Sequence, residues 1–193
     1  MNFKIWSAWV ITTGYAIIRY NVVGPVSWDN LPVYILNKGI SFTSAVYLFY
    51  SSWNAFKGNK DKVAEWGRYA YYAVILHVLL SLAFYSPEYF AKMYGDEKMN
   101  IWGEMMILCG VLGAFVFYYI PKITHILTRL QTMHMVSGLL LALHVFFLGG
   151  RGWSNVPGWY GGLPPISLLS FLLAILAFVF YTLAMIHSSS ESK

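Results

Sequence analysis

Six stretches of about twenty mostly apolar residues follow one another along this chain and use up nearly all of it. A helix rises 1.5 Å per residue, so about 20 residues cross the roughly 30 Å hydrocarbon core of a bilayer. Lipid admits only helices or closed barrels, and the sequence lacks the ten-residue alternating segments of barrel strands. We therefore predict an all-α, polytopic membrane protein with about six transmembrane helices in one bundle. The expected spans are residues 3–23, 38–56, 68–86, 101–120, 130–149 and 166–187.

The composition supports a bilayer as the solvent of this chain. Its 193 residues are 58% hydrophobic and only 11% charged, whereas a soluble domain carries about a quarter charged residues. No long linker or internal repeat divides the sequence, so we expect a single domain over residues 1–193. Neither a glycine-rich phosphate loop nor a dinucleotide fingerprint is present, and the single cysteine excludes an intrachain disulfide. Any flavin or nicotinamide domain would belong to another protein.

The formal net charge of +5 does not indicate affinity for nucleic acid in a membrane protein. Its distribution among the connections indicates how the chain is oriented in the membrane. Basic residues concentrate in alternate connections and at both ends of the chain, and such regions remain on the cytoplasmic side. The pattern predicts cytoplasmic N- and C-termini. The residues concerned are Lys4, Lys57, Lys60, Lys62, Arg68, Lys122, Arg129 and Lys193.

Three histidines lie inside the predicted spans and a fourth, His187, ends the last one. A polar side chain inside a span is costly and is taken as functional unless a structural partner explains it. His77 is about nine residues from either end of span three, near the expected midplane. His134 and His144 lie near opposite ends of span five. These two are about 15 Å apart along one helix, so they cannot bind the same metal ion, and span three must supply a partner. His125 and His187 occupy interfacial positions and are interpreted as structural.

Two imidazoles on different helices are sufficient to hold a planar, apolar haem b within a bundle. His77 is then one axial ligand, and the residues alone leave its partner open between His134 and His144. The alternative for each histidine is a hydrogen-bonded packing residue. Arg151, just beyond the outer end of span five, could pair with a haem propionate or simply extend to the interface.

Two segments resemble the ferric reductase-like transmembrane family, nearest to the haem-bearing membrane subunits of bacterial periplasmic methionine sulfoxide reductase systems. The first is WGRYAYYAVILHVLLSLAF, which contains His77, and the second begins at Arg129-Leu130-Gln131 and reaches His144. Gln131 stands where the family pattern has a histidine. The resemblance covers roughly residues 35–150 and implies that His77 and His144 are the axial ligands of one b-type haem. It leaves open a second haem, for which His134 would be the substitute ligand.

The resulting hypothesis is a membrane electron-transfer subunit with no catalytic residues of its own, within the oxidoreductase system of a bacterial inner membrane. Electrons would come from a quinol or a cytoplasmic flavoprotein and pass to a partner redox protein on the outer face, and a bound quinone remains open. The alternative hypothesis is a haem-free scaffold subunit of a larger membrane complex, consistent with the 19% aromatic content. A transporter is disfavoured, because the spans lack mid-membrane Asp or Lys residues and inverted repeats.

Overall fold

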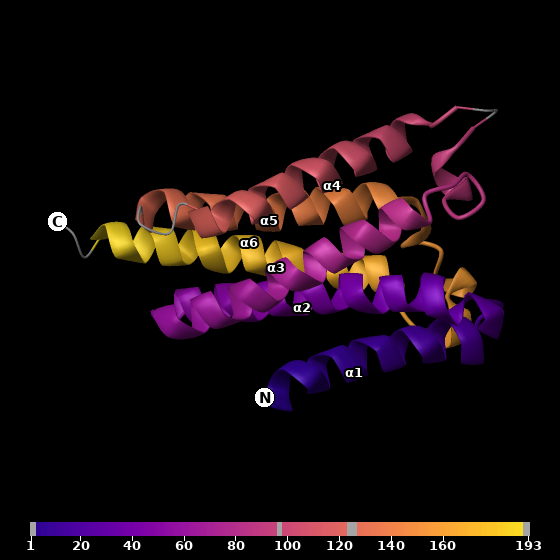
Figure 1. The fold of residues 1–193 in the computed structure, drawn as a ribbon, viewed down its shortest axis with the longest axis horizontal. Helices are drawn as coiled ribbons and strands as arrows, with labels where there is room; N and C mark the ends of the chain where they lie inside the picture. Colours follow the sequence, from indigo (N-terminus) through magenta and orange to yellow (C-terminus); the bar gives the residue numbers. More distant parts are fainter. Residues whose placement is uncertain (1–2, 96–97, 123–126, 191–193) are drawn as a thin grey trace.

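The computed structural model describes residues 3–95, 98–122 and 127–190, and it is all-helical over these ranges. Six long helices run up and down (Figure 1), connected by turns and short 3₁₀ or π segments. They are α1 (Phe3–Ile17), α2 (Leu36–Phe56), α3 (Lys60–Ala83), α4 (Ile101–Tyr119), α5 (Leu127–Gly149) and α6 (Ile166–Ser190). The predictions of an all-helical chain and of six helices are confirmed.

Helix boundaries differ from the predicted spans mainly at α3. This helix begins at Lys60, eight residues before the predicted start at Arg68, because the Asn59 side chain caps it by accepting a hydrogen bond from the Lys62 amide. The connection after α2 is consequently a tight turn, in which Gly58 adopts a positive φ of 72°. At α1 the regular helix ends at Ile17 and continues as a π-helical segment over Ile18–Val22.

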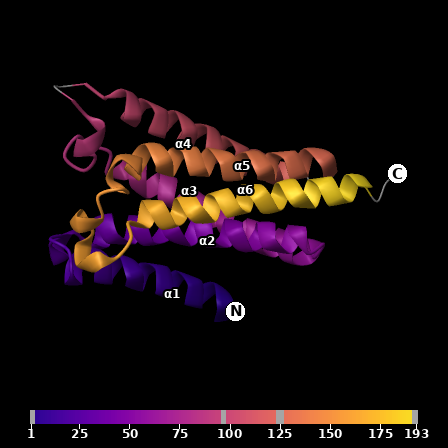
Figure 2. The same cartoon turned by 180° about the vertical axis from the view of Figure 1, so that it is seen from behind.

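The bundle is layered, with α1 on one side and α4 on the other (Figures 1 and 2). Helix α2 packs against α1, α3 and α6, and α5 packs against α4 and α6. At Gly138 of α5, an added Cβ would lie 3.0 Å from the Phe178 backbone nitrogen of α6, so these helices approach backbone to backbone. Helix α1 is linked to α2 by a Thr12–Thr43 hydroxyl hydrogen bond of 2.6 Å.

Small polar side chains lie inside the bundle among apolar core residues, and many large apolar side chains are exposed on its outside. Ser51, Ser52 and Ser137 are fully buried, whereas Val111 and Phe115 of α4 are about 60% exposed. In lipid, small hydroxyl residues let helices pack closely and hydrogen-bond, and apolar side chains face the hydrocarbon. Within the described ranges, three segments are long and apolar enough to cross a membrane, namely Ile101–Tyr119, Thr132–Gly152 and Tyr160–His187. These three segments support the prediction of a membrane protein.

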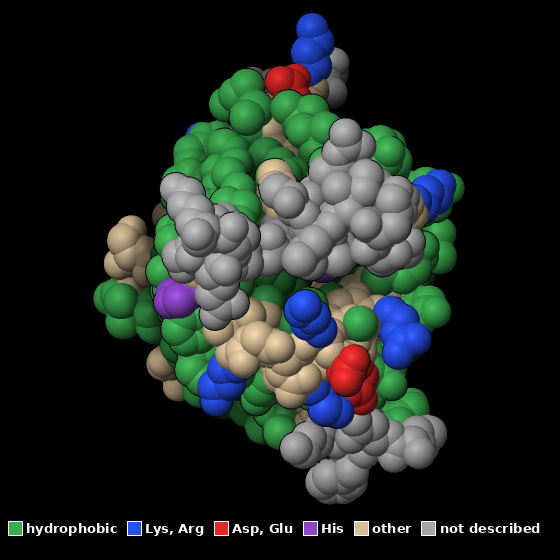
Figure 3. Space-filling model, turned by 90° about the vertical axis from the view of Figure 1, so that its left-hand side faces the viewer, with side chains coloured by type: hydrophobic (Ala, Val, Ile, Leu, Met, Phe, Trp, Pro, Cys, Tyr) green, Lys and Arg blue, Asp and Glu red, His purple; other side chains and the backbone are tan. Residues whose placement is uncertain are grey.

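The two ends of the bundle differ in chemistry. We call the end that carries the α2–α3 turn the basic end, because the exposed Lys57, Lys60 and Lys62 lie there, and Figure 3 shows Lys and Arg side chains gathered around it. We call the opposite end, where α1 joins α2 and α5 joins α6, the loop end. Lys4, His125, Arg129, Gln131 and Lys193 belong to the parts whose side chains the structure does not describe.

Candidate functional site

His77 of α3 and His144 of α5 meet inside the bundle, with ring centroids 6.5 Å apart and ring planes at 75°. The two helices are not packed along each other, since α3 lies mainly on α2, and α5 lies on α4 and α6. The imidazoles therefore reach toward each other across the bundle. Each histidine lies about five or six residues, roughly 8–9 Å, from the loop end of its helix. This equal depth is a requirement for two ligands of one metal.

The depth of His77 differs from the expectation based on the predicted span. With α3 starting at Lys60 and ending at Ala83, His77 lies clearly nearer the loop end than the middle of the helix. Two boundaries cause the difference: α3 ends at Ala83, before the predicted end at Ser86, and the Asn59 cap extends the opposite end of α3 into the basic connection. Only this shift toward the loop end matches the depth of His77 to that of His144.

Each imidazole is oriented by a hydrogen bond at Nδ1. The Nδ1–H of His144 donates to the backbone carbonyl of Met106 on α4, over 2.8 Å. The Nδ1–H of His77 donates to Oδ1 of Asn37 on α2, over 2.6 Å, and the amide nitrogen of Asn37 donates to Oγ of Ser81 over 3.0 Å. These acceptors fix the tautomer, so Nε2 carries the lone pair on both rings. Metal-binding histidines are oriented by the same arrangement.

Gly110 of α4 provides the space for the His144 ring. A Cβ built at this position would lie 2.8 Å from Nδ1 and 3.0 Å from Cε1 of His144, closer than packed atoms allow. The Met106 carbonyl is one helical turn before Gly110 on α4, so the same strip of α4 both receives the ring and accepts its proton. The ring of His144 is consequently held in one place by backbone atoms alone.

The spacing of the two rings fits one shared metal. An imidazole nitrogen binds a metal at about 2 Å, and its ring centroid lies about 1 Å further back, so two such ligands place their centroids about 6 Å apart. Among the described residues, no group of three or more His, Cys, Asp or Glu side chains is placed to hold a metal ion. A pair of imidazoles is the protein ligand set of a metal that receives its other ligands from a macrocycle, as in haem.

His134, also on α5, lies in a different environment. Its ring stacks on Tyr181 of α6 with centroids 5.0 Å apart and planes at 10°, and its backbone carbonyl accepts a hydrogen bond from Ser137. Stacking presents the face of the imidazole, not its in-plane nitrogens, to the tyrosine. The Nδ1–H of His187 donates to the backbone carbonyl of Leu183 over 2.7 Å, and its ring contacts Phe56 at the basic end. The structure thus brings His77 and His144 together, and places His134 and His187 elsewhere.

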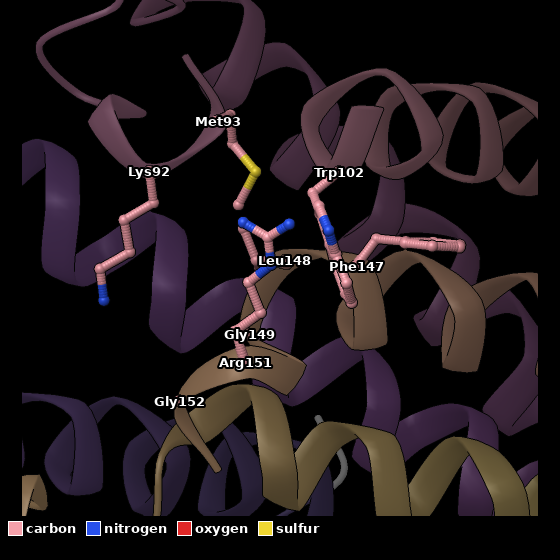
Figure 4. Close-up of a pocket in the computed structure, with 8 residues that line it drawn as sticks. All are labelled: Lys92, Met93, Trp102, Phe147, Leu148, Gly149, Arg151 and Gly152. Carbon is pink, nitrogen blue, oxygen red and sulfur yellow. The ribbon is translucent and has the colours of Figure 1, made fainter. Parts of the chain in front are cut away.

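Arg151 lines a cavity of about 370 Å³ at the loop end, together with Lys92, Met93 and Trp102. Figure 4 shows its guanidinium rising toward the indole of Trp102, with which it makes a cation–π contact at 4.3 Å. Phe147, one turn beyond His144 on α5, lines the same cavity. Arg151 therefore lines a cavity that contains a second basic residue, Lys92, and that lies about one helical turn beyond His144 along α5.

The methionines and the charged residues of the spans have ordinary roles in the structure. Met93 and Met106 are buried among their neighbours. Arg19 donates to the carbonyls of Leu163 and Tyr160, and Glu104 is exposed.

Sequence reasoning missed Asn37, the Met106 carbonyl and Gly110. Asn37 carried a usable signal, since it is a polar residue at the start of an apolar span. The Met106 carbonyl carried no sequence signal, because every residue has a backbone carbonyl and only the packing of α4 on α5 selects this one.

In comparisons with protein-family models and with curated proteins, no match to this chain is found. The interpretation of the site therefore depends on its geometry.

Proposed function

We propose that this protein is a b-type haem-binding, electron-transfer subunit of a bacterial inner membrane, with His77 and His144 as axial ligands. The observation that supports the proposal is the pair of imidazoles 6.5 Å apart with both Nδ1 atoms hydrogen-bonded. When bound, haem b supplies one-electron transfer between ferrous and ferric iron. The family resemblance of the segments around His77 and His144 supports the same assignment.

The residues of this chain have separate roles in the proposal. His77 and His144 ligate through Nε2, and Asn37 and the Met106 carbonyl orient the two rings and increase their basicity as ligands. Arg151 lies at the mouth of the cavity beside His144, where its positive charge would favour a haem propionate.

The proposal includes the orientation of the bundle in the membrane. All six helices span the membrane, the basic end faces the cytoplasm, and both termini lie on that side. The histidine pair then lies toward the outer face, from which an electron reaches a partner redox protein of a larger complex. The donor on the inner side is a quinol or a cytoplasmic flavoprotein, and the position of His134 nearer that side keeps a second haem within the proposal.

A reduced-minus-oxidised absorption spectrum of the purified protein tests this function. We expect a stoichiometric b-type spectrum and a low-spin, six-coordinate signal for the wild type. His77→Ala should lose that signal, and His187→Ala, which alters a histidine at the basic end, should keep it. A colourless wild-type protein that co-purifies with other membrane subunits would overturn the haem assignment and support the scaffold alternative.

A further inference from the structure

Cations and tyrosines alternate along a short ladder at the loop end of the bundle. Arg19 lies over the rings of Tyr20 and Tyr160 at 5.2 and 5.1 Å, and Lys38 lies over Tyr20 and Tyr34 at 5.1 and 4.3 Å. The ladder joins the end of α1, the start of α2 and the α5–α6 connection. Two cations are thus brought together on the faces of three tyrosine rings, and Arg19 and Tyr20 are buried there.

No carboxylate balances this charge within the described residues. The ion pair found there, Lys62–Glu65, lies at the basic end of the molecule. Burial raises the pKa of Tyr34 to about 12, so its phenol stays neutral and contributes no negative charge. Arg19 is 4% exposed, bonds only to neutral carbonyls, and leaves its buried Nε without a partner. A cation taken out of water without a counter-charge is costly, which indicates a site that receives an anion.

Lys38 is the member of the ladder nearest to the histidine pair. It directly follows Asn37, whose side chain holds His77, and its ammonium interacts electrostatically with His77. Lys92, which lines the cavity of Arg151, also interacts electrostatically with Lys38. Lys38 on α2, Lys92, and Arg151 beyond α5 therefore place positive charge at the loop end, the end to which both imidazoles are nearer.

We propose that Lys38 binds a carboxylate of the prosthetic group held by His77 and His144, namely a haem propionate. The proposal rests on the function proposed above and adds a specific partner for the haem on the α2 side, separate from Arg151. A propionate would supply the counter-charge that the described residues of the ladder lack. The tyrosines of the ladder would hold the ammonium in place by their ring faces.

A thermodynamic cycle on both the protein and the cofactor tests this contact. The full-length protein is produced in a haem-deficient host and reconstituted with haem b or with its dimethyl ester, in which both propionates are uncharged. Release of the cofactor to an excess of apomyoglobin is then timed for the wild type, Lys38→Met and Lys38→Arg. Lys57→Met is the matched control, because Lys57 also lies over an aromatic ring, that of Trp53 at 4.5 Å, but at the basic end.

With haem b, we expect Lys38→Met to release the cofactor about tenfold faster than the wild type, as for a lost charged hydrogen bond. Lys38→Arg should restore most of the retention, and Lys57→Met should behave as the wild type. With the dimethyl ester, wild type and Lys38→Met should release the cofactor at equal rates. An equal acceleration with both cofactors would show a packing effect and overturn the contact. A wild-type protein that takes up neither cofactor would instead refute the proposed function.

Discussion

Two histidines on the same helix show how differently one residue type is used. His144 meets a second imidazole, donates from Nδ1 to a backbone carbonyl and lies against a glycine. His134, nearly three turns away on α5, lies flat on Tyr181. His134 is 7% exposed and His144 is only partly buried, so burial alone does not distinguish a ligand from a packing residue. What distinguishes the two histidines is whether the ring nitrogens or the ring face meets the neighbouring residue.

The sharpest test of this difference removes each ring in turn. We expect His144→Ala to abolish six-coordinate haem, because one axial ligand is lost, and His134→Ala to retain a full complement of the haem held at His77. The measurement is the haem-to-protein ratio from the pyridine haemochrome spectrum, with ligation from the low-spin EPR signal. If His134→Ala removed that signal and His144→Ala preserved it, the pairing of His77 with His144 would be wrong.

The space for the His144 ring can be filled without touching the ring itself. A Cβ at Gly110 would lie 2.8 Å from Nδ1, so Gly110→Ala should displace the imidazole and weaken haem retention by roughly 100-fold. Gly113→Ala is the matched control on the same helix, because its nearest neighbour, Leu140 Cβ, is at an ordinary 3.7 Å. Cofactor release rates measure both variants. Equal rates for the two alanine variants would contradict the positioning role of Gly110.

The hydrogen bond at His77 is expected to contribute less than the ligands themselves. Asn37→Leu removes the acceptor of Nδ1–H, and loss of such an outer partner typically costs about 10- to 100-fold in metal affinity. Ser81→Ala removes only the hydrogen bond from the Asn37 amide nitrogen to Ser81 Oγ, so it should lower the haem affinity less. Haem titration of the apoprotein gives the affinities. An unchanged affinity in Asn37→Leu would show that His77 is oriented by packing instead.

The stacking of His134 should matter for stability and not for the proposed cofactor site at His77. Tyr181→Leu removes an aromatic pair and a ring that is 2% exposed, so we expect a loss of about 1–3 kcal/mol in stability. Thermal unfolding in detergent measures the loss, and the low-spin spectrum of the haem at His77 should be unchanged. A lost low-spin signal at full folding would place His134, not His144, beside the cofactor.

Much of the architecture follows from local sequence and the chemistry of lipid. Long apolar segments form helices because every backbone group must be paired internally, and the predicted ranges differ from the observed helices by a few residues at most ends. The exception at α3 arises because the Asn59 cap determines where the helix starts. Hydropathy measures only how apolar a segment is, so it placed that boundary at the edge of the apolar run.

The chemistry of the candidate site was predicted only in part. His77 and His144 could be identified from the sequence because burying a polar imidazole in an apolar span costs free energy, and this cost depends only on the residue type. The sequence left their pairing open to His134, because depth along a helix does not specify rotation about its axis or which neighbour it faces. Asn37 and Gly110 act through contacts between helices distant in sequence, and these contacts exist only once the bundle has packed.

The sequence by itself determined that this protein is helical, apolar and supplied with imidazoles inside its helices, because these properties belong to single segments. The tertiary structure decided which two imidazoles meet, which nitrogen each one presents, and where positive charge lies without a carboxylate among the described residues. The physical reason is that the packing of α3 on α2 and of α5 on α4 sets these distances, and single-segment periodicity contains no information about them.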